Sequence, residues 1–289
     1  MSDFVRLHNK HFNFKQFILN AFEEDLGDGD HTALSIIPKN QKGKMQLLVK
    51  EEGIIAGVEA AAKVFKLRDK SFKLKILIKD GTPVKKGDIV FTIEGNVQKL
   101  LSSERLVLNI LQRMSGIATK TAHLQNLCKG TKTKVIDTRK TTPGFRFFEK
   151  WAVVIGGGTN HRYGLFDMIL IKDNHIDFAG GITKAIDSAN SYLKKKRRKL
   201  AIEVETRNLE DVKKVLIHGG VQRIMLDNYS PEQTGEAVKL IKGKFEVESS
   251  GGITESNIAD YAKCGVDFIS IGALTHHIKS LDLSLKAIK

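Results

Sequence analysis

Apolar positions in the first third of the chain follow two different spacings. They recur at every second position, as in strands with one buried face, in residues 45–53 and 72–79. Residues 88–95 are a further predicted strand, which Gly95 closes. Residues 58–67 are rich in alanine and predict a helix, and helical spacing returns over 102–114 and 117–127. The pattern predicts an α/β region in which strands and helices are mixed along the chain.

A regular alternation of strand, loop and helix begins near residue 134. The predicted strands are residues 134–138, 167–172, 200–205, 223–227, 245–250 and 267–272. Most of these strands are apolar on both faces, which is typical of a parallel sheet covered by helices. So many short units in half of the chain favour a barrel-like α/β layer over two doubly wound domains.

The 289 residues include 41% hydrophobic and 28% charged residues, a globular composition that excludes a disordered chain. Only two cysteines occur, Cys128 and Cys264, and they form no CxxC motif, which excludes a disulfide framework and a cysteine-based zinc site. No apolar run approaches the roughly 18 residues that cross a bilayer, and the first residues lack the apolar core of a secretory signal. We therefore expect a cytoplasmic protein with no membrane partner.

Lysine and arginine outnumber aspartate and glutamate by 47 to 33, which gives a formal net charge of +14. Such an excess indicates nucleic acid, an anionic membrane surface or strongly anionic small substrates as partners. The densest basic run, residues 194–199, follows an amphipathic stretch and contains no aromatic residue. We interpret it as a solvated helix end, where cations also suit the helix dipole, and not as a surface for single-stranded nucleic acid.

Polar residues collect at the carboxyl end of every strand predicted after residue 134. The groups are Asp137–Lys140, Lys172–His175, Glu203 with Glu205, Asp227–Asn228, Ser249–Gly252 and Ser270–Ala273. Helix capping explains one such group but not six in succession. In parallel α/β barrels the loops after the strands form the active site. The sequence therefore predicts an active site at that end of the barrel.

The predicted site combines cations with a pair of acids. Its cationic or potentially cationic residues are Arg139, Lys140, His161, Arg162, Lys172 and His175. Glu205 and Asp227 lie at the ends of successive strands, and two carboxylates beside a cationic pocket indicate Mg²⁺ shared with a substrate phosphate. The alternative is that the two acids pair with Lys140 and Lys172 without any metal.

Glycine and serine follow the last two predicted strands, at 249–252 and 270–273. Their backbone N–H groups can form a phosphate cradle at a helix N-terminus, although tight turns explain the same glycines. Gly156–Gly158 does not follow a strand and does not match GxGxxG, so a dinucleotide-binding motif is rejected. We expect residues 249–252 and 270–273 to hold a phosphate.

Eight segments match one known family in residue order. They are EDLGDGDHT (24–32), RMSGIAT (113–119), DTRKTTPG (137–144), GGGTNHRYGL (156–165), LIKDNHI (170–176), IEVE (202–205), MLDN (225–228) and SSGGIT (249–254). On these segments, nearly over its whole length, the chain resembles the quinolinate phosphoribosyltransferases. The resemblance implies phosphoribosyl transfer from phosphoribosyl pyrophosphate to quinolinate with decarboxylation, in the presence of Mg²⁺. The products would be nicotinate mononucleotide, pyrophosphate and CO₂, in NAD biosynthesis.

The resemblance also implies an architecture of two α/β domains. An N-terminal α/β sandwich is expected over residues 1–115, and an open seven-stranded parallel α/β barrel over 116–274. The resemblance leaves open that the C-terminal residues 275–289 pack on the N-terminal sandwich. The family forms a homodimer in which one protomer's N-terminal domain completes the other's active site, and larger assemblies such as a hexamer stay open.

Family positions imply a role for each site residue. Those expected around quinolinate are Arg105 of the partner subunit, Arg139, His161, Arg162 and Lys172. Further substrate contacts, including those to the 5′-phosphate, are expected from Thr138, Ser250, Gly251, Gly252, Ser270, Ile271, Gly272 and Ala273. Lys140, Glu205 and Asp227 are expected to be catalytic, with Lys140 facing the departing pyrophosphate and the two acids holding Mg²⁺.

Two other functions stay open at this stage. A related phosphoribosyltransferase that acts on a single-carboxylate pyridine such as nicotinate would not need the full set of cations. A basic nucleic-acid-binding protein predicts cations spread along one exposed face and no acidic pair at strand ends. Within the enzyme, a Schiff base on Lys172 is disfavoured because neither substrate offers a suitable ketone or aldehyde.

Overall fold

The structure is a computed structural model that describes residues 11–288, and the chain divides into two compact units. The first contains the segments Met1–Ala122, Thr141–Gly157 and His277–Lys289, and the second contains His123–Lys140 and Gly158–His276. The expected domain division between residues 115 and 116 stays a prediction. The compact units follow a different division, because residues 141–157 belong to the first of them.

An antiparallel sheet of four strands, in the order β12-β1-β5-β3, organises the first unit. Its strands are β1 (Lys42–Val49), β3 (Lys73–Ile76), β5 (Ile89–Asn96) and β12 (Leu283–Ala287). On β1, Met45, Leu47 and Val49 are buried and alternate with more exposed residues, as expected for a strand with one buried face. Phe91 and Ile93 of β5 join them in the core. Since β12 pairs with β1, a segment near the end of the chain completes this sheet.

The helices of the first unit include one that is longer than predicted. The other helices are α2 (Phe14–Leu26), α3 (His31–Ile36), α4 (Val58–Arg68) and α6 (Arg146–Ile155), and a small sheet pairs β2 (Gly53–Ile54) with β4 (Pro83–Val84). The pattern predicts two helices over 102–127, but α5 (Val97–Leu127) is continuous over 31 residues. A side chain at Gly116 would run into the backbone of Lys279. Glycine therefore permits a close approach there and does not end the helix.

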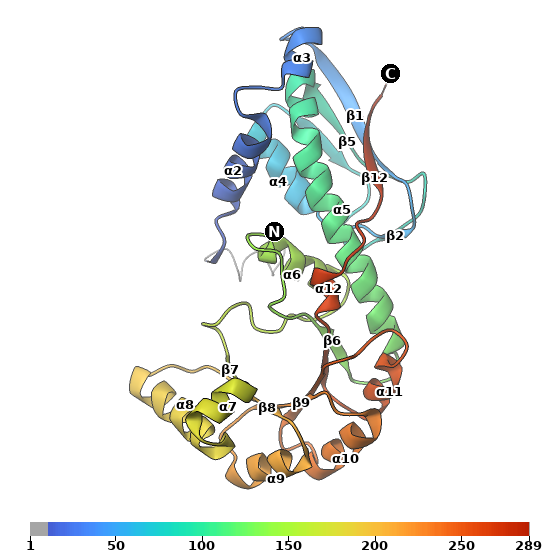
Figure 1. Ribbon diagram of the computed structural model, residues 1–289. Coiled ribbons are helices and arrows are strands. Elements are labelled where there is room, and N and C mark those ends of the chain that lie inside the picture. The colour runs from blue at the N-terminus through green and yellow to red at the C-terminus, as the bar shows by residue number, and fades with distance from the viewer. Residues whose placement is uncertain (1–10, 289) are drawn as a thin grey trace. The chain divides into compact units, whose positions relative to one another are not determined.

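A parallel sheet in the order β6-β11-β10-β9-β8-β7 organises the second unit. Its strands are β6 (Lys134–Ile136), β7 (Ile169–Ile171), β8 (Ile202–Thr206), β9 (Arg223–Asp227), β10 (Glu246–Ser250) and β11 (Phe268–Ser270). The helices are α7 (Asp173–Ala179), α8 (Ile182–Lys196), α9 (Leu209–His218), α10 (Pro231–Ile241), α11 (Ile258–Lys263) and α12 (Ala273–His276). Helices α8 to α11 lie along the outer face of the curved sheet (Figure 1). All six carboxyl ends therefore meet at one edge.

The barrel differs from the expected one in its seventh strand. Thr159, in the segment after α6, forms an isolated parallel bridge with Ile136 of β6. Thr159 donates its N–H to the Val135 carbonyl at 2.9 Å, and the chain then leaves the ladder. Within residues 11–288 the parallel sheet thus has six full strands, and a single bridge stands where the seventh was expected.

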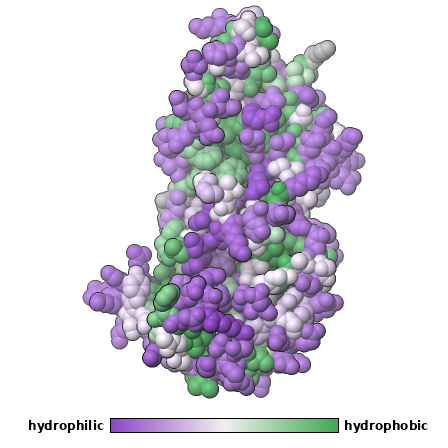
Figure 2. Space-filling view, in the orientation of Figure 1, coloured by the Kyte–Doolittle hydropathy of each residue, from purple (hydrophilic) through white to green (hydrophobic). Residues whose placement is uncertain are grey.

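The basic run at 194–199 is a solvated helix end, as predicted. Lys194, Lys195 and Lys196 form the last turn of α8, and Arg197 ends it with a φ of 52° in the left-handed region. All six side chains of the run are exposed. More widely, hydrophilic side chains cover most of the face shown in Figure 2. Across residues 11–288, no helix is long and apolar enough to cross a membrane.

Candidate active site

A cavity of about 760 Å³ lies at the carboxyl ends of the parallel strands. The predicted site residues that line it are Thr138, Arg139, Lys140, His161, Arg162, Lys172, Asp227, Ser250, Gly251, Gly252, Ser270, Ile271, Gly272 and Ala273. Most of them follow strands β6, β7, β9, β10 and β11, and they are far apart in the sequence. The parallel topology brings them together because every strand ends at the same edge.

Three residues of the predicted site do not line this cavity: Arg105, His175 and Glu205. His175 instead accepts the N–H of Lys172 at its Nδ1, at 2.9 Å. Arg105 is exposed on α5, within the first unit. Glu205 is buried on β8, where its carboxylate lies 3.4 Å from the Lys172 ammonium and accepts the N–H of Asp173 at 3.4 Å. The alternative for Glu205, an ion pair with Lys172, is therefore present.

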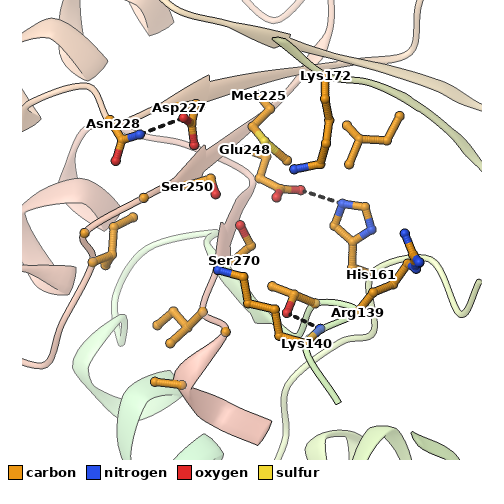
Figure 3. Close-up of a pocket in the computed structure, with 18 of the residues that line it drawn as sticks. Arg139, Lys140, His161, Lys172, Met225, Asp227, Asn228, Glu248, Ser250 and Ser270 are labelled. Atoms are coloured by element: carbon orange, nitrogen blue, oxygen red, sulfur yellow. Dashed lines mark hydrogen bonds and ion pairs between the residues drawn. The ribbon is translucent and has the colours of Figure 1, made fainter. Parts of the chain in front are cut away.

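Of the two acids predicted to hold Mg²⁺, Asp227 is the one that faces the cavity (Figure 3). It is half-buried at the end of β9, and Asn228 Nδ2 donates to its Oδ2 at 2.7 Å. Burial raises the pKa of the Asp227 carboxyl, and the Lys172 ammonium and the Asn228 hydrogen bond lower it only in part. A carboxylate whose burial is incompletely compensated is a suitable ligand for a further cation.

A buried polar cluster, made of His161, Glu203, Arg223 and Glu248, lies inside the barrel beside the cavity. His161 Nε2 is 3.0 Å from Glu203 Oε2 and 3.5 Å from Glu248 Oε2. Arg223 Nη1 donates to Glu248 Oε2 at 3.2 Å. Glu203 and Glu248 are wholly buried, and Glu248 and His161 also line the cavity (Figure 3).

The two acids of this buried polar cluster hold a proton. Burial raises the pKa of Glu248 to about 8, and the neighbouring Glu203 adds to the rise. Burial also raises the pKa of Glu203, which Arg223 opposes. Two buried carboxyl groups in contact do not both ionise at neutral pH. The spacing of His161, Glu203 and Glu248 also suits a metal ion, but Arg223 already supplies positive charge there, so a shared proton accounts for the cluster.

The proton on Glu248 should make stability depend on pH. The folded chain keeps this proton up to about pH 8, whereas the unfolded chain loses it above the ordinary pKa of 4.5. The free energy of unfolding should therefore decrease as pH rises between these values, by on the order of 3 kcal/mol. Glu248→Gln copies the protonated carboxyl and should remove much of this decline. Urea denaturation at about pH 5 and about pH 8 measures it, and an equally steep decline in the variant would contradict the assignment.

Two guanidinium groups lie together at the cavity. Arg139 and Arg162 both line it, and Arg162 Nη1 donates to the Met168 carbonyl at 3.2 Å. Burial, followed by repulsion from Arg139, lowers the pKa of Arg162. Lys172 points into the same cavity (Figure 3). Cations held this close favour a ligand with more than one negative charge.

The loop after β10 needs glycine for its conformation. Gly251 and Gly252 have φ of 90° and 63°, and a side chain at Gly251 would collide with Asn228. Since α11 begins only at Ile258, this loop does not lie at a helix N-terminus, which corrects one part of the expected phosphate cradle. The loop still brings bare backbone to the cavity.

The loop after β11 has little space for a side chain. A Cβ atom at Gly272 would lie 3.0 Å from Lys140 Cδ and 3.1 Å from His276 Nε2. Lys140 is also tied to this loop, because its carbonyl accepts the Thr275 hydroxyl at 2.7 Å. A backbone wall with a nearby ammonium suits a phosphate group.

The chain matches two family descriptions in succession. "Quinolinate phosphoribosyl transferase, N-terminal domain" matches residues 30–115, and "Quinolinate phosphoribosyl transferase, C-terminal domain" matches residues 117–286. The chain belongs to the quinolinate phosphoribosyltransferase family. The resemblance seen in the eight sequence segments is thereby confirmed.

Similarity to quinolinate phosphoribosyltransferases extends over nearly the whole chain. It is 45% identical to "Nicotinate-nucleotide pyrophosphorylase [carboxylating], chloroplastic" of Arabidopsis thaliana, over 95% of this chain and 83% of that protein. It is 40% identical to a "Probable nicotinate-nucleotide pyrophosphorylase [carboxylating]" of Bacillus subtilis, over 95% and 93%. The crystal structure of NadC from Streptococcus pyogenes has a TM-score of 0.90 at 39% identity, over 96% and 97%. The expected α/β fold class is confirmed.

Sequence reasoning missed two titratable residues of this cavity, Glu248 and His276. Glu248 stands two positions before Ser250 on β10, so strand alternation places both on the inner face. That periodicity could have identified it, whereas a search limited to strand ends could not. His276 ends α12, a helix too short for its position to be recognised from hydrophobic spacing.

Proposed function

We propose that this protein transfers the phosphoribosyl group of phosphoribosyl pyrophosphate to quinolinate and releases pyrophosphate and CO₂, giving nicotinate mononucleotide. One observation carries the proposal: Arg139, Arg162 and Lys172 converge on one cavity. Quinolinate presents two adjacent carboxylates, which arginine binds in a bidentate manner and lysine binds as a point charge. The family to which the chain belongs supports the same reaction.

The sugar donor fits the rest of the cavity. Lys140 extends into it (Figure 3), and an ammonium there stabilises the charge of the departing pyrophosphate. The backbone of Gly251, Gly252 and Gly272 suits the 5′-phosphate. With the dicarboxylate on one set of cations and the donor on another, the ring nitrogen and the ribose C1 are held for reaction.

Asp227 and Glu205 are the residues that would hold Mg²⁺. They end neighbouring strands, and the burial of Asp227 is incompletely compensated, which fits a cation that takes carboxylates, phosphate oxygens and water. When bound, the metal would neutralise negative charge on the pyrophosphate. The carboxylates themselves favour the positive charge that develops on the ribose as the donor bond breaks.

We further propose a homodimer in which Arg105 of the partner subunit contacts quinolinate. Arg105 is exposed on α5 and is therefore available to a second chain. A guanidinium at the open side of the cavity would add to the charge that Arg139 and Arg162 provide. In this arrangement each active site needs both protomers.

Arg105→Ala should raise the quinolinate KM by roughly ten- to a hundredfold and leave the fold intact. A charge-assisted contact to a carboxylate is lost, while an exposed side chain adds little to stability. Steady-state kinetics and thermal unfolding measure both, and Arg198→Ala, in the solvated basic run, is the control.

Mixed dimers of Arg105→Ala with Lys172→Ala should regain activity, because one of their two sites keeps both residues. Parent-like quinolinate affinity in Arg105→Ala, or inactive mixed dimers, would show that the site is not shared between protomers.

A direct assay tests the main proposal. The protein, Mg²⁺ and phosphoribosyl pyrophosphate are mixed with quinolinate or with nicotinate, and mononucleotide is measured. We expect product from quinolinate and little from nicotinate, which cannot engage the full set of cations. Product from nicotinate alone would favour the single-carboxylate alternative.

Partner classes and location follow from charge and cysteine chemistry. Because the cations at the strand ends converge on one cavity, we propose small anionic substrates and no nucleic-acid partner. Cys128 and Cys264 are free, which suits a reducing compartment, and we propose the cytoplasm.

A further inference from the structure

The segment that carries His161 and Arg162 is held by side-chain acceptors. After the single bridge at Thr159, four successive backbone N–H groups, those of residues 161–164, donate to side chains. The N–H groups of Tyr163 and Gly164 donate to Asp167 at 2.6 and 2.9 Å. In a full strand a backbone ladder would make these bonds, so here the side chains decide where the segment lies.

Asp137 provides the acceptors for the first part of this segment. Its carboxylate is wholly buried just after β6. Oδ1 accepts the N–H of His161 at 2.9 Å, and Oδ2 accepts Asn160 Nδ2 at 2.6 Å. His161 Nδ1 in turn accepts the N–H of Arg162 at 2.7 Å. One buried carboxylate thus fixes the backbone that leads into Arg162.

Arg162 depends on such support because its guanidinium lies in an unfavourable place. It is partly buried beside the like charge of Arg139, and both effects lower its pKa, while the charges of Glu203 and Asp167 oppose them. One direct hydrogen bond, from Nη1 to the Met168 carbonyl at 3.2 Å, holds the guanidinium against the repulsion from Arg139, so the position of the backbone also matters. A displacement of about 1 Å is enough to lose much of the benefit of a positioned group.

We propose that Asp137 is a positioning residue for the substrate: it holds residues 160–162 so that the Arg162 guanidinium faces the quinolinate carboxylates. The identity of that substrate rests on the proposed function, but the hydrogen bonds that Asp137 accepts from Asn160 and His161 are a property of the fold. Asp137 acts through the segment and not by contact with substrate. Its loss should therefore weaken quinolinate binding selectively, because the glycine loops after β10 and β11 do not depend on it.

The experiment removes the carboxylate oxygens of Asp137 and compares the Kd of quinolinate with the Kd of phosphoribosyl pyrophosphate. In Asp137→Ala, the quinolinate Kd measured by calorimetry should rise about tenfold or more, and the phosphoribosyl pyrophosphate Kd should change less than about twofold. The amide hydrogens of His161 and Arg162 should exchange faster with solvent, which needs no ligand. Asp137→Asn should recover much of the affinity, because an amide oxygen still accepts from His161, and the amide NH₂ can donate to Asn160 Oδ1 once the Asn160 amide turns over.

Asp267 offers a matched control in the same unit. It accepts the Val247 N–H at 2.9 Å and the Lys132 ammonium at 2.6 Å, just before β11 and away from the cavity. Asp267→Ala should change neither the quinolinate Kd nor exchange at residues 160–162. Parent-like quinolinate binding in Asp137→Ala, or equal weakening in Asp267→Ala, would overturn the proposal.

If Asp137→Ala does not fold, Asn160→Ala, which removes one of the two donors, must raise the quinolinate Kd about threefold with the donor Kd unchanged. An unchanged quinolinate Kd in Asn160→Ala overturns the proposal. If the parent protein binds no quinolinate, the proposed function fails, whereas the exchange rates still decide whether Asp137 holds the segment.

Discussion

Replacing Asp227 with asparagine should lower turnover roughly a hundredfold while the protein stays folded. The substitution is nearly isosteric but removes a negative charge that faces the cavity, where the proposed metal ion and the developing charge on the ribose would need it. Glu205→Gln should act in the same direction, because Glu205 ends the neighbouring strand and also holds Lys172 at 3.4 Å. Turnover measured against Mg²⁺ concentration, beside thermal unfolding, separates lost chemistry from lost stability.

The pH dependence gives a second readout of Asp227. Burial raises its pKa, so activity that needs the carboxylate should fall as pH drops, and at a higher pH than for an exposed aspartate. Asp177→Asn is the matched control, since Asp177 forms an exposed ion pair with Arg207 at 2.9 Å, which contributes little. Unchanged activity in both Asp227→Asn and Glu205→Gln would mean that the two acids serve only as ion-pair partners.

The position of the cavity follows from the sequence because parallel strands end at one edge. Lys172, Asp227 and Ser270 stand at or just after the last residue of β7, β9 and β11, and strand ends can be recognised where an apolar run stops. Chemistry placed at those points is brought together by topology alone. That is why so many of the predicted site residues line one cavity.

Other features depend on contacts between distant segments and have no local signal. α5 continues through Gly116, where the backbone of Lys279 leaves no room for a side chain, although glycine disfavours helix in isolation. The raised pKa of Glu248 depends on Glu203, two strands away in the sheet. The seventh strand is reduced to one bridge because side chains such as Asp137 replace its ladder. Tertiary context overrides local preference in each case.

The protein should release no CO₂ from quinolinate alone. CO₂ release should require both phosphoribosyl pyrophosphate and Mg²⁺, and its amount should equal that of pyrophosphate. Labelled CO₂ evolution, with each component omitted in turn, measures this. The size of the effect is all or none, since the uncatalysed background of the free dicarboxylate is negligible on the scale of enzymatic rates.

The reason lies in where charge goes when the bond between C2 and its carboxylate breaks. The electron pair stays on C2 until a proton arrives, and in free quinolinate it would lie beside a mostly neutral ring nitrogen with its own lone pair. Arg139 and Arg162, bound to the carboxylates, would hold negative charge in place and oppose its departure as CO₂. Once ribose is attached, the nitrogen is cationic and stabilises the adjacent carbanion. Steady CO₂ release from protein and quinolinate alone would refute this order and would point to Lys172 or His161 as a direct participant.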